Sequence, residues 1–279
     1  MKVSYLGTTT LLFDDGADQI LFDCHVTRPS FFRFLVGRFR TDQATADRVI
    51  EDFAIRRLRG IFISHSHHDH VLDAPYFALR CGADLFGSPS ALNVAIGGDV
   101  PEERLHSFGD SMAYQVGGFG ITVLPSLHSA PTLLNNDLGQ SIDAPVRQPA
   151  GRRTFKEGGS FDFMIAHGGR RFLIRPSYNY VEGQLRGIGA DVLFLGITGL
   201  SRDSRERQSA FFTETVDRTH PRLVIPIHWD NFFSPLYGAP SGMPWYGDDT
   251  GESMRLLAAH CRSAGVDCAV QLPLTSLEV

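Results

Sequence analysis

Apolar and polar positions alternate along the first part of the chain in a way that is typical of β-strands. Over VSYLGTTTLLF and QILFDC the alternation has a period of two, and DDGAD between them has turn chemistry, so we predict two strands joined by a turn. Between residues 28 and 58 the apolar spacing changes to that of a helix, which predicts a helical insertion. The run GIFIS then predicts a short buried strand.

The rest of the chain continues to alternate between strand and helix patterns. DAPYFALRCG predicts a helix that Asp73 caps, and SFDFMIAHGGRRFLIRPS predicts a hairpin that turns at HGG. ADVLFLGI, RLVIPIHWDNF and CAVQL predict further strands, whereas RQSAFFTETVDRTH and ESMRLLAAHCRSAG predict helices. Residues 131–160 have no periodicity, and a loop of that length inside a compact domain is usually functional or mobile. We therefore expect one α/β domain over residues 1–279.

Four histidines and two aspartates lie within ISHSHHDHVLD, residues 63–73, directly after an apolar run. Burying so many polar side chains is costly unless each has a partner. In an extended segment, residues at i and i+2 point the same way, so His65 and His67 can present their imidazoles to one ion. Asp69 and His70 can face the same pocket from the turn that follows. Imidazole and carboxylate ligands suit zinc, manganese or iron. The cluster therefore predicts one or two divalent metal ions, with zinc as the first choice.

The spacing H-x-H-x-D-H resembles the signature of the metallo-β-lactamase fold superfamily, and the resemblance extends over essentially the whole chain. It implies a four-layer αββα sandwich and metal-dependent hydrolysis. It also implies that SLHS and IPIHWD each supply a histidine after a later strand, and that Asp23 at the end of QILFD lies beneath the site. The implied ligands are His65, His67 and His128 for one metal, and Asp69, His70 and His228 for the other.

Within that superfamily, the sequence resembles one branch in two of its motifs and departs from the usual pattern at one position. HDHVLD and PIHWDNF resemble most the branch of the ascorbate phosphate lactonases and the N-acyl-phosphatidylethanolamine phospholipase D type enzymes. The superfamily also has a bridging aspartate after a central strand, yet FLIRPSYNY has no acid. Ser177 stands where the aspartate would be, with Arg175 two residues earlier. A neutral hydroxyl is a poor substitute for a bridging carboxylate, which predicts weaker binding of the second metal.

Several other polar residues have roles that the sequence leaves more open. We expect His68 to lie behind the ligands or to face solvent, because it points away from the preceding histidine. His25 either orients a ligand or is a polar loop residue. For Asp230 we favour a role in its own loop, and for Arg152 and Arg153 a solvated charge pair over a clamp for an anionic group. Aromatic residues of loop 234–249 are expected to shape the pocket mouth: Tyr237, Trp245 and Tyr246.

The composition is that of an ordinary globular protein, with 43% hydrophobic and 20% charged residues in 279. A net charge of −5 disfavours a nucleic-acid partner. Cys24, Cys81, Cys261 and Cys268 form no C-x-x-C pair, which favours free thiols in a reducing compartment. The first residues lack a signal-peptide pattern, and no apolar run is long enough to span a membrane. We expect a cytoplasmic protein that acts on a small molecule; homo-oligomerisation stays open.

These residue types together point to hydrolysis. A bound cation lowers the pKa of water from ~15.7 towards ~7, and two cations roughly 3.5–4 Å apart can hold the nucleophile and stabilise developing negative charge. We expect Asp69 to orient the water and accept its proton. The first hypothesis is therefore a metal-dependent hydrolase of an ester, lactone or phosphodiester. The alternatives are a degenerate, non-catalytic member that binds metal or senses a ligand, which the missing acid at Ser177 favours, and redox chemistry at iron.

Overall fold

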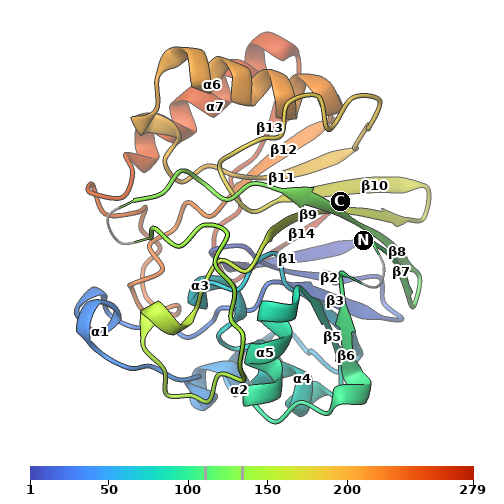
Figure 1. The fold of residues 1–279 in the computed structure, drawn as a ribbon. Helices are drawn as coiled ribbons and strands as arrows, with labels where there is room; N and C mark the ends of the chain where they lie inside the picture. Colours follow the sequence, from blue (N-terminus) through green and yellow to red (C-terminus); the bar gives the residue numbers. More distant parts are fainter. Residues whose placement is uncertain (110–111, 133–134) are drawn as a thin grey trace.

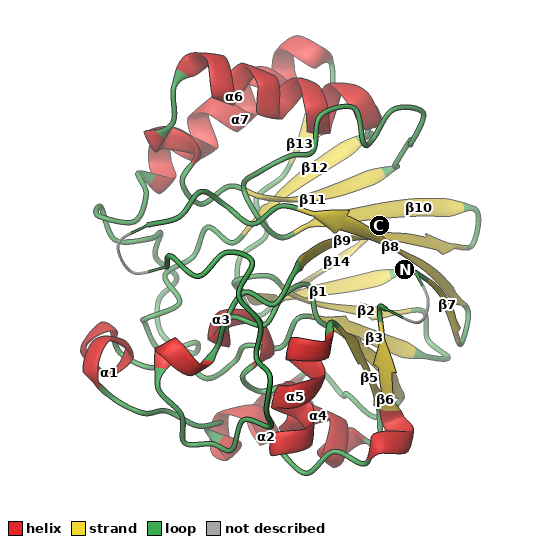
Figure 2. Ribbon diagram, viewed as in Figure 1, coloured by secondary structure: helices red, strands yellow, loops and turns green. Residues whose placement is uncertain are grey.

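The computed structural model describes residues 1–109, 112–132 and 135–279. Two seven-stranded sheets lie face to face in the middle of the molecule, and helices cover the outer face of each sheet (Figures 1 and 2). This arrangement is the four-layer αββα sandwich that the sequence predicts. Within the described ranges, no helix has the length and apolar character needed to cross a bilayer.

The first sheet contains the N-terminal strands and the last strand of the chain. Its order is β14-β1-β2-β3-β4-β5-β6. The helices α2, α4 and α5 lie on its outer face, in the lower half of Figure 1. The strands are β1 (Lys2–Gly7), β2 (Thr10–Asp14), β3 (Gln19–Phe22), β4 (Leu58–Phe62), β5 (Asp84–Gly87), β6 (Leu105–Ser107) and β14 (Thr275–Glu278). The helices of this half are α1 (Phe31–Val36), α2 (Gln43–Asp52), α3 (His68–Val71), α4 (Ala74–Cys81), α5 (Pro89–Gly97) and the 3₁₀ turn η1 (Glu102–Arg104).

The second sheet is formed by the later strands, in the order β13-β12-β11-β10-β9-β8-β7. The helices α6 and α7 cover its outer face, in the upper half of Figure 1. Its strands are β7 (Ala113–Val116), β8 (Phe119–Ser126), β9 (Ser160–His167), β10 (Arg170–Arg175), β11 (Val192–Gly196), β12 (Leu223–Ile227) and β13 (Asp267–Cys268). The helical segments are η2 (Arg152–Thr154), η3 (Leu200–Arg202), α6 (Arg205–Phe212), the π-helical turn η4 (Thr213–Asp217) and α7 (Thr250–Ala264).

Phenylalanine rings fill the space between the two sheets. The ring of Phe13 in β2 meets Phe22 of its own sheet at 5.5 Å between centroids, edge-on. It meets Phe172 and Phe194 of the opposite sheet at 5.6 and 5.7 Å, in the same geometry. All four rings are buried. Because helices or the other sheet cover both faces, the central strands are continuous apolar runs. This packed core holds the strand ends in fixed places.

The carboxyl ends of several strands meet at one edge of the sandwich. In the first sheet β3 and β4 are parallel. In the second sheet β10, β11 and β12 are parallel, and β8 runs the same way as β10 because both are antiparallel to β9. Ligands of open α/β sheets bind beyond the carboxyl ends of the strands. The segments that follow β3, β4, β8, β10 and β12 therefore define the edge where a site is expected.

The first predicted strand is two strands in the structure. β1 ends at Gly7 and β2 begins at Thr10, and Thr8 between them has a φ of +55°. The corner falls in GTTT, which has no Pro, Asn or Asp, and threonine is common in strands, so the sequence did not reveal it. The corner places Thr8 and Thr9 at the edge where the strand ends meet, and both contact residues of the site described below.

Two further details differ from the prediction. Only Cys268 of the predicted strand CAVQL lies in a strand, the two-residue β13, whereas the last strand, β14, pairs with β1, with Lys2 opposite Glu278. Because β14 is a largely exposed edge strand, no apolar pattern marks it. Asp73 makes no side-chain capping bond to α4. Its carboxylate instead accepts hydrogen bonds from the backbone N–H groups of Val26 and Thr27, at 2.7 and 2.8 Å, and ties the segment after β3 to this helix.

Candidate metal centre

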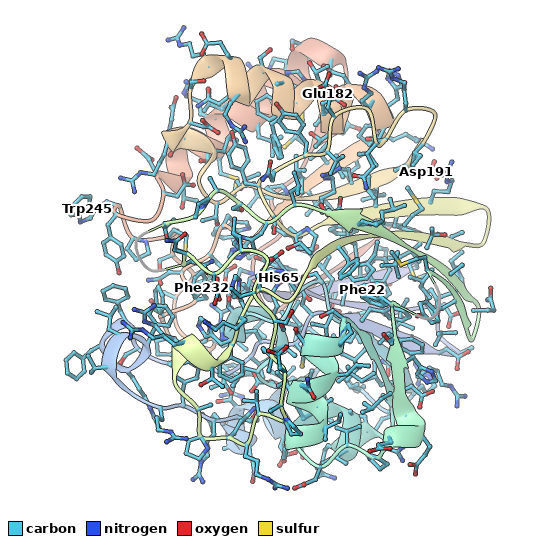
Figure 3. The ribbon with its side chains drawn as sticks, in the orientation of Figure 1. Phe22, His65, Glu182, Asp191, Phe232 and Trp245 are labelled. Carbon is cyan, nitrogen blue, oxygen red and sulfur yellow. The ribbon has the colours of Figure 1, made fainter. Side chains whose placement is uncertain are left out.

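The segment that leaves β4 brings two pairs of potential metal ligands into one turn. His67 has an extended backbone, with φ −64° and ψ 152°, and α3 begins at the next residue. The rings of His65 and His67 lie 4.9 Å apart between centroids. The turn then brings His70 back against His65, with 3.7 Å between their rings. A strand end followed directly by a short helix is what allows neighbours in sequence to face one pocket. In Figure 3 the side chain of His65 lies between the two halves of the sandwich.

His65, His67 and His128 form the first ligand cluster. One ligand atom of each residue lies within 4.8 Å of those of the other two. His128 follows β8 of the second sheet, and its ring centroid is 4.8 Å from that of His65 and 4.7 Å from that of His67. Three imidazoles around one point are a common donor set for zinc. Each sheet thus contributes ligands to this cluster.

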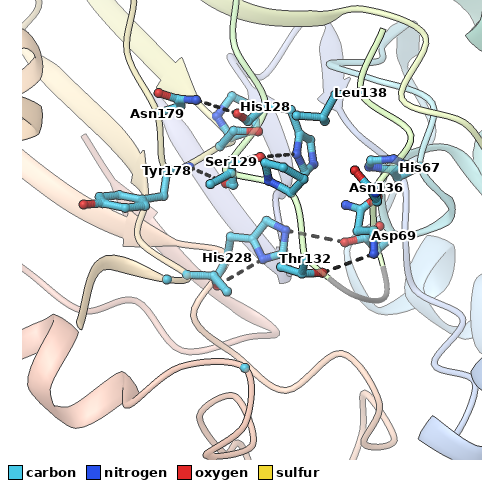
Figure 4. Close-up of a pocket in the computed structure, with 18 of the residues that line it drawn as sticks. His67, Asp69, His128, Ser129, Thr132, Asn136, Leu138, Tyr178, Asn179 and His228 are labelled. Atoms are coloured by element: carbon cyan, nitrogen blue, oxygen red, sulfur yellow. Dashed lines mark hydrogen bonds and ion pairs between the residues drawn. The ribbon is translucent and has the colours of Figure 1, made fainter. Parts of the chain in front are cut away.

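Each ring of the first cluster uses one nitrogen for a protein partner. Nδ1 of His65 is 3.2 Å from the hydroxyl of the preceding serine, and Nδ1 of His128 donates to the carbonyl of Ser129 at 2.9 Å (Figure 4). Nε2 of His67 is 3.0 Å from a carboxylate oxygen of Asp137. Nε2 of His65 is buried and has no hydrogen-bond partner among the described residues. Such an orphaned nitrogen is costly, and a cation among the three rings would satisfy it.

Asp69, His70 and His228 form the second ligand cluster, again with one ligand atom of each within 4.8 Å of the others. Oδ2 of Asp69 lies 3.6 Å from Nε2 of His70 and 3.5 Å from Nε2 of His228. Figure 4 shows Asp69 and His228 facing one another across the pocket. Two imidazoles and one carboxylate also suit zinc, manganese or iron. The residues present therefore fit a divalent cation at both clusters.

A buried carboxylate behind the second cluster orients His70. Nδ1 of His70 is 2.7 Å from Oδ2 of Asp23. The same carboxylate accepts hydrogen bonds from the hydroxyl of Thr9 and the backbone N–H of Ser64, each at 2.7 Å. Asp23 is buried, and its φ of +51° marks the sharp turn after β3. A carboxylate in this position fixes the ring and makes the other nitrogen a better ligand. Asp23 thus lies beneath the cluster, where the resemblance implies it.

The segment after β12 is held in an unusual conformation at His228. Its φ is +56°, and its backbone N–H donates to the carbonyl of Thr8 at 2.5 Å. Thr8 in turn donates its N–H to the carboxylate of Asp230 at 2.8 Å. That carboxylate also accepts from Tyr5 at 2.5 Å and pairs with Arg28 at 2.9 Å, in a buried network. The predicted role of Asp230 within its own loop is therefore wrong, because its carboxylate bonds to Tyr5, Thr8 and Arg28 and fixes the corner on which His228 rests.

Burial sets the charge state of several ligands. It lowers the pKa of His65 well below the usual value, and repulsion from neighbouring histidines adds to the effect. Burial likewise lowers the pKa of His128 to about 3. Both rings are therefore neutral near pH 7, the form that binds metal. Burial alone would raise the pKa of Asp69, but His70 and His228 outweigh it and hold this pKa well below its usual value.

His68 is buried and does not face solvent. Its ring stacks on Phe34 at 5.0 Å and lies 5.2 Å from Phe39. Burial lowers its pKa to about 4. Its Nδ1 is 3.5 Å from Oδ1 of Asp69, so of the two predicted places it takes the one behind the ligands. The ring of His25 packs edge-on against that of His68, 5.7 Å away, and is fully buried rather than part of a polar loop.

No carboxylate stands at the position of the bridging aspartate. Ser177 follows β10 and lines the cavity over the two clusters. Arg175, the last residue of β10, is almost fully buried and pairs with Asp162 of β9 at 3.1 Å. Burial raises the pKa of Asp162, although the nearby guanidinium opposes this. The arginine thus has its own buried partner in the sheet.

A cavity of about 1530 Å³ opens over both clusters. Arg152 and Arg153 line it, so the predicted solvated pair lies at the pocket wall, with Arg152 over the ring of Phe34. Tyr246 also lines it, as expected. Tyr237 does not, because it donates to Asp52 of α2 instead. Trp245 is 83% exposed and projects at the periphery of the molecule in Figure 3.

Asp137 is the residue of this centre that sequence reasoning missed. It lies in the aperiodic segment 131–160, where neither period nor spacing distinguishes one polar residue from another. Burial alone would raise the pKa of Asp137, but the hydrogen bond with His67 contributes to holding it below the usual value. Only the folded arrangement of the loop reveals this contact.

An αββα sandwich with histidine-rich ligand clusters at the strand ends defines the metallo-β-lactamase class of fold. Residues 18–229, more than half of the chain, match the family described as the Beta-lactamase superfamily domain. The chain belongs to this superfamily.

Similar proteins of known sequence and structure agree with this assignment. A UPF0173 metal-dependent hydrolase of Carboxydothermus hydrogenoformans is 27% identical over 247 residues, which cover 87% of this chain and 89% of the relative. YhfI of Bacillus subtilis, a metallo-beta-lactamase fold protein, has a TM-score of 0.61 at 14% identity, over 99% of both chains. CmlA of Streptomyces venezuelae, a diiron beta-hydroxylase, has a TM-score of 0.62 at 16% identity, over all of this chain and 54% of CmlA. At these identities the two structures show the shared fold.

Proposed function

We propose that this protein is a metal-dependent hydrolase that uses a metal-activated water on a small-molecule substrate. The observation that supports this most is the convergence of six potential ligands in two adjacent clusters, of which His67, Asp69, His128 and His228 line one cavity. Bound divalent ions would supply a water of lowered pKa and stabilise negative charge on the substrate. Zinc is the first choice, with manganese or iron as alternatives, and the two clusters offer places for one or two ions.

The chain's own side chains supply the remaining chemistry. The low pKa of Asp69 keeps its carboxylate ionised, so it can accept the proton of a nearby water and orient it. Its position between His70 and His228 holds the carboxylate at the floor of the cavity. Asp23 bonds directly to His70, whereas Asp230 bonds to Thr8, whose carbonyl accepts from the backbone N–H of His228. Preorganised groups of this kind contribute to catalysis because they need no rearrangement during the reaction.

The proposed substrate is an ester, a lactone or a phosphodiester. The resemblance of HDHVLD and PIHWDNF to the lactonase and phospholipase D type branch supports these bond types. The cavity is large enough for a substrate with a sizeable group on either side of the reacting bond, since ligand sites typically have ~300–1,000 Å³. The substrate is accordingly a molecule that enters this cavity, and a nucleic-acid partner is not expected for a chain of net charge −5.

A panel of lactones, phosphodiesters and carboxylic esters tests the proposal. We expect turnover of at least one class, its loss when a chelator removes the metal, and its return when zinc or manganese is added. An absorbance spectrum of the same preparation separates an iron centre from a zinc centre. Undiminished turnover by protein shown to contain no metal would contradict the proposal.

Ser177 supports a second candidate function. Without a bridging carboxylate the two clusters share no protein ligand, which favours a non-catalytic member that binds a metal or senses a ligand in the same cavity. This candidate predicts metal binding and saturable ligand binding without turnover of any member of the panel. The two candidates therefore differ in one readout, the rate of bond cleavage.

A further inference from the structure

We propose that Asp137 is a positioning residue of the first ligand cluster, which holds the ring of His67 and makes residues 137–160 of the long loop part of the metal site. The inference rests on the proposed function, because it concerns the metal that the cluster would bind. It goes beyond it by assigning a role to a loop residue that lies outside the two clusters.

The contact between Asp137 and His67 determines which ring nitrogen is free. Oδ1 of Asp137 lies 3.0 Å from Nε2 of His67, and the two side chains are 16% and 7% exposed. An ionised carboxylate can only accept a hydrogen bond, so Nε2 must carry the hydrogen. The lone pair is then on Nδ1, the nitrogen left to join His65 and His128. Carboxylates that hold a ligating imidazole in this way fix both its tautomer and its orientation.

Hydrogen bonds within the loop hold Asp137 in place. The N–H of Gly139 donates to Oε2 of Glu157 at 2.7 Å, and the hydroxyl of Ser160 donates to Oε1 at 2.7 Å. Glu157 is itself buried. The N–H of Gln140 donates to the carbonyl of Asp137 at 2.9 Å and closes the turn. These hydrogen bonds hold the turn that carries the carboxylate of Asp137 in one conformation.

The same part of the loop is bonded to the turn that carries the ligands. Ser66 lies between His65 and His67 in sequence and is buried. Its hydroxyl donates to the carbonyl of Lys156 at 2.7 Å, and its N–H donates to the carbonyl of Glu157 at 2.9 Å. Loop and ligand turn are thus joined both through a side chain and through the backbone. Stabilising one of them must stabilise the other, because such coupling is reciprocal.

The position of this carboxylate also matters electrostatically. Among the described residues, Asp137 is the acidic side chain that forms an ion-pair contact with the first cluster. Ser177, which lines the same cavity, supplies no charge. Partners that hold a ligating histidine are typically worth ~10–100-fold in metal affinity. Asp137 is expected to have an effect of this size.

The variants Asp137→Ala and Asp137→Asn test the inference, with Asp143→Asn as a matched control. Asp143 is an exposed acid of the same loop. Zinc affinity is measured without substrate, by competition with a coloured chelator. We expect about 10–100-fold weaker binding for Asp137→Ala, a smaller loss for Asp137→Asn, whose amide oxygen can still accept, and no more than about a twofold change for the control.

Two further readouts distinguish positioning from a general effect on folding. Long-range ¹H–¹⁵N NMR of the histidine rings should show the proton of His67 on Nε2 in the native protein and a mixture of tautomers in Asp137→Ala. Zinc should slow proteolytic cleavage of segment 131–160 in the native protein and in Asp143→Asn, but much less in Asp137→Ala.

Unchanged zinc affinity and an unchanged His67 tautomer in Asp137→Ala would overturn the inference. If the native protein binds no divalent metal, the proposed function fails first. The tautomer of His67 in the metal-free protein still tests the hydrogen bond in that case, so the two failures can be told apart.

Discussion

The two ligand clusters lie side by side at one edge of the sandwich, yet different parts of the molecule hold them. The second cluster is built into the core: Asp23 holds His70, and the buried network of Asp230 fixes the corner beneath His228. The first cluster consists of three imidazoles, and its carboxylate contact, Asp137, comes from the long loop.

This difference suggests that the two clusters respond to different changes. Substitutions in the buried network should impair the second cluster, whereas substitutions in the loop should impair the first. Ser177, which lines the cavity, supplies only a hydroxyl where the resemblance implies a bridging carboxylate. The separation of the clusters is partial, because the rings of His65 and His70 lie 3.7 Å apart and the hydroxyl of Ser64 contacts both Asp23 and His65.

The largest expected effect comes from breaking the first cluster with His67→Ala. The variant should bind about one metal ion fewer per chain than the native protein. Its affinity at this cluster should fall by more than the ~100-fold that an outer partner costs, and turnover should fall to background. Metal content by mass spectrometry and turnover of the best substrate measure this. His106→Ala, a histidine of β6 outside the cavity lining, is the control. Equal metal content and rate in both variants would remove His67 from the site.

The second-largest effect is expected from Asp23→Asn, which changes the side chain that orients His70 of the second cluster. The amide has one acceptor oxygen in place of two, so it leaves some of the donors around it unsatisfied. We expect a loss of about 3 kcal/mol in the free energy of unfolding and ~10–100-fold weaker binding of the second metal. Urea unfolding and metal titration measure the two changes. Asp47→Asn, whose carboxylate pairs with Arg80 on the surface, should leave stability essentially unchanged.

Acidification should destabilise the metal-free protein, and the share of a single buried histidine should be smaller than the effect of Asp23→Asn. The pKa of His68 is about 4 in the folded protein and that of His128 about 3, against ~6.5 in an unfolded chain. Below pH ~6.5 the unfolded state therefore binds protons that the folded state does not, and the free energy of unfolding falls as the pH falls. His68 alone should account for roughly 2 kcal/mol between pH 7.5 and pH 5.

Urea unfolding in the presence of a chelator, at a series of pH values, measures this effect. His68→Phe should flatten the pH dependence, because a phenyl ring fits among Phe34, Phe39 and the other aromatic neighbours and takes up no proton. A native protein equally stable at pH 5 and pH 7.5 would show that these rings are protonated at the same pH in both states.

The smallest effect is expected from Ser177→Asp, which adds a carboxylate to the cavity that lies over the two clusters. A carboxylate at this place in the cavity should increase the affinity for the second metal by about tenfold, equivalent to ~1.4 kcal/mol. Metal titration and turnover are measured together. A gain in both would show that the serine limits the native site. A gain in metal without a gain in rate would show that the serine belongs to the working arrangement.

The sequence predicted the metal ligands better than the residues that hold those ligands in place. His65, His67, Asp69 and His70 follow a buried strand in a short polar motif, so their placement could be read from local spacing. His128 and His228 could be assigned only through the resemblance, since nothing in their own segments indicates which strands end together. The sandwich fold followed from the same resemblance and from the interleaved strand and helix patterns.

Apart from Asp23, which the resemblance implied, the residues that hold the ligands in place could not be predicted, because they depend on contacts between distant segments. Asp137 lies in an aperiodic loop, and the corner at Thr8 lies in a run of threonines that is equally compatible with one continuous strand. His68 faces the core because Phe34 and Phe39, from the helical insertion, cover it. Asp73 looks like a helix cap in sequence, yet its carboxylate is taken by the backbone after β3. In each case the local sequence is compatible with several roles for the residue, and a contact with a distant segment determines which role it has.

Anomalous scattering from crystals grown with zinc locates the bound ions directly. We infer that six side chains from distant parts of the chain converge around at least one cation. We expect an anomalous peak among the rings of His65, His67 and His128. If both clusters are filled, a second peak should lie beside Asp69, His70 and His228. Crystals that contain zinc elsewhere but show no peak at either cluster would contradict this inference.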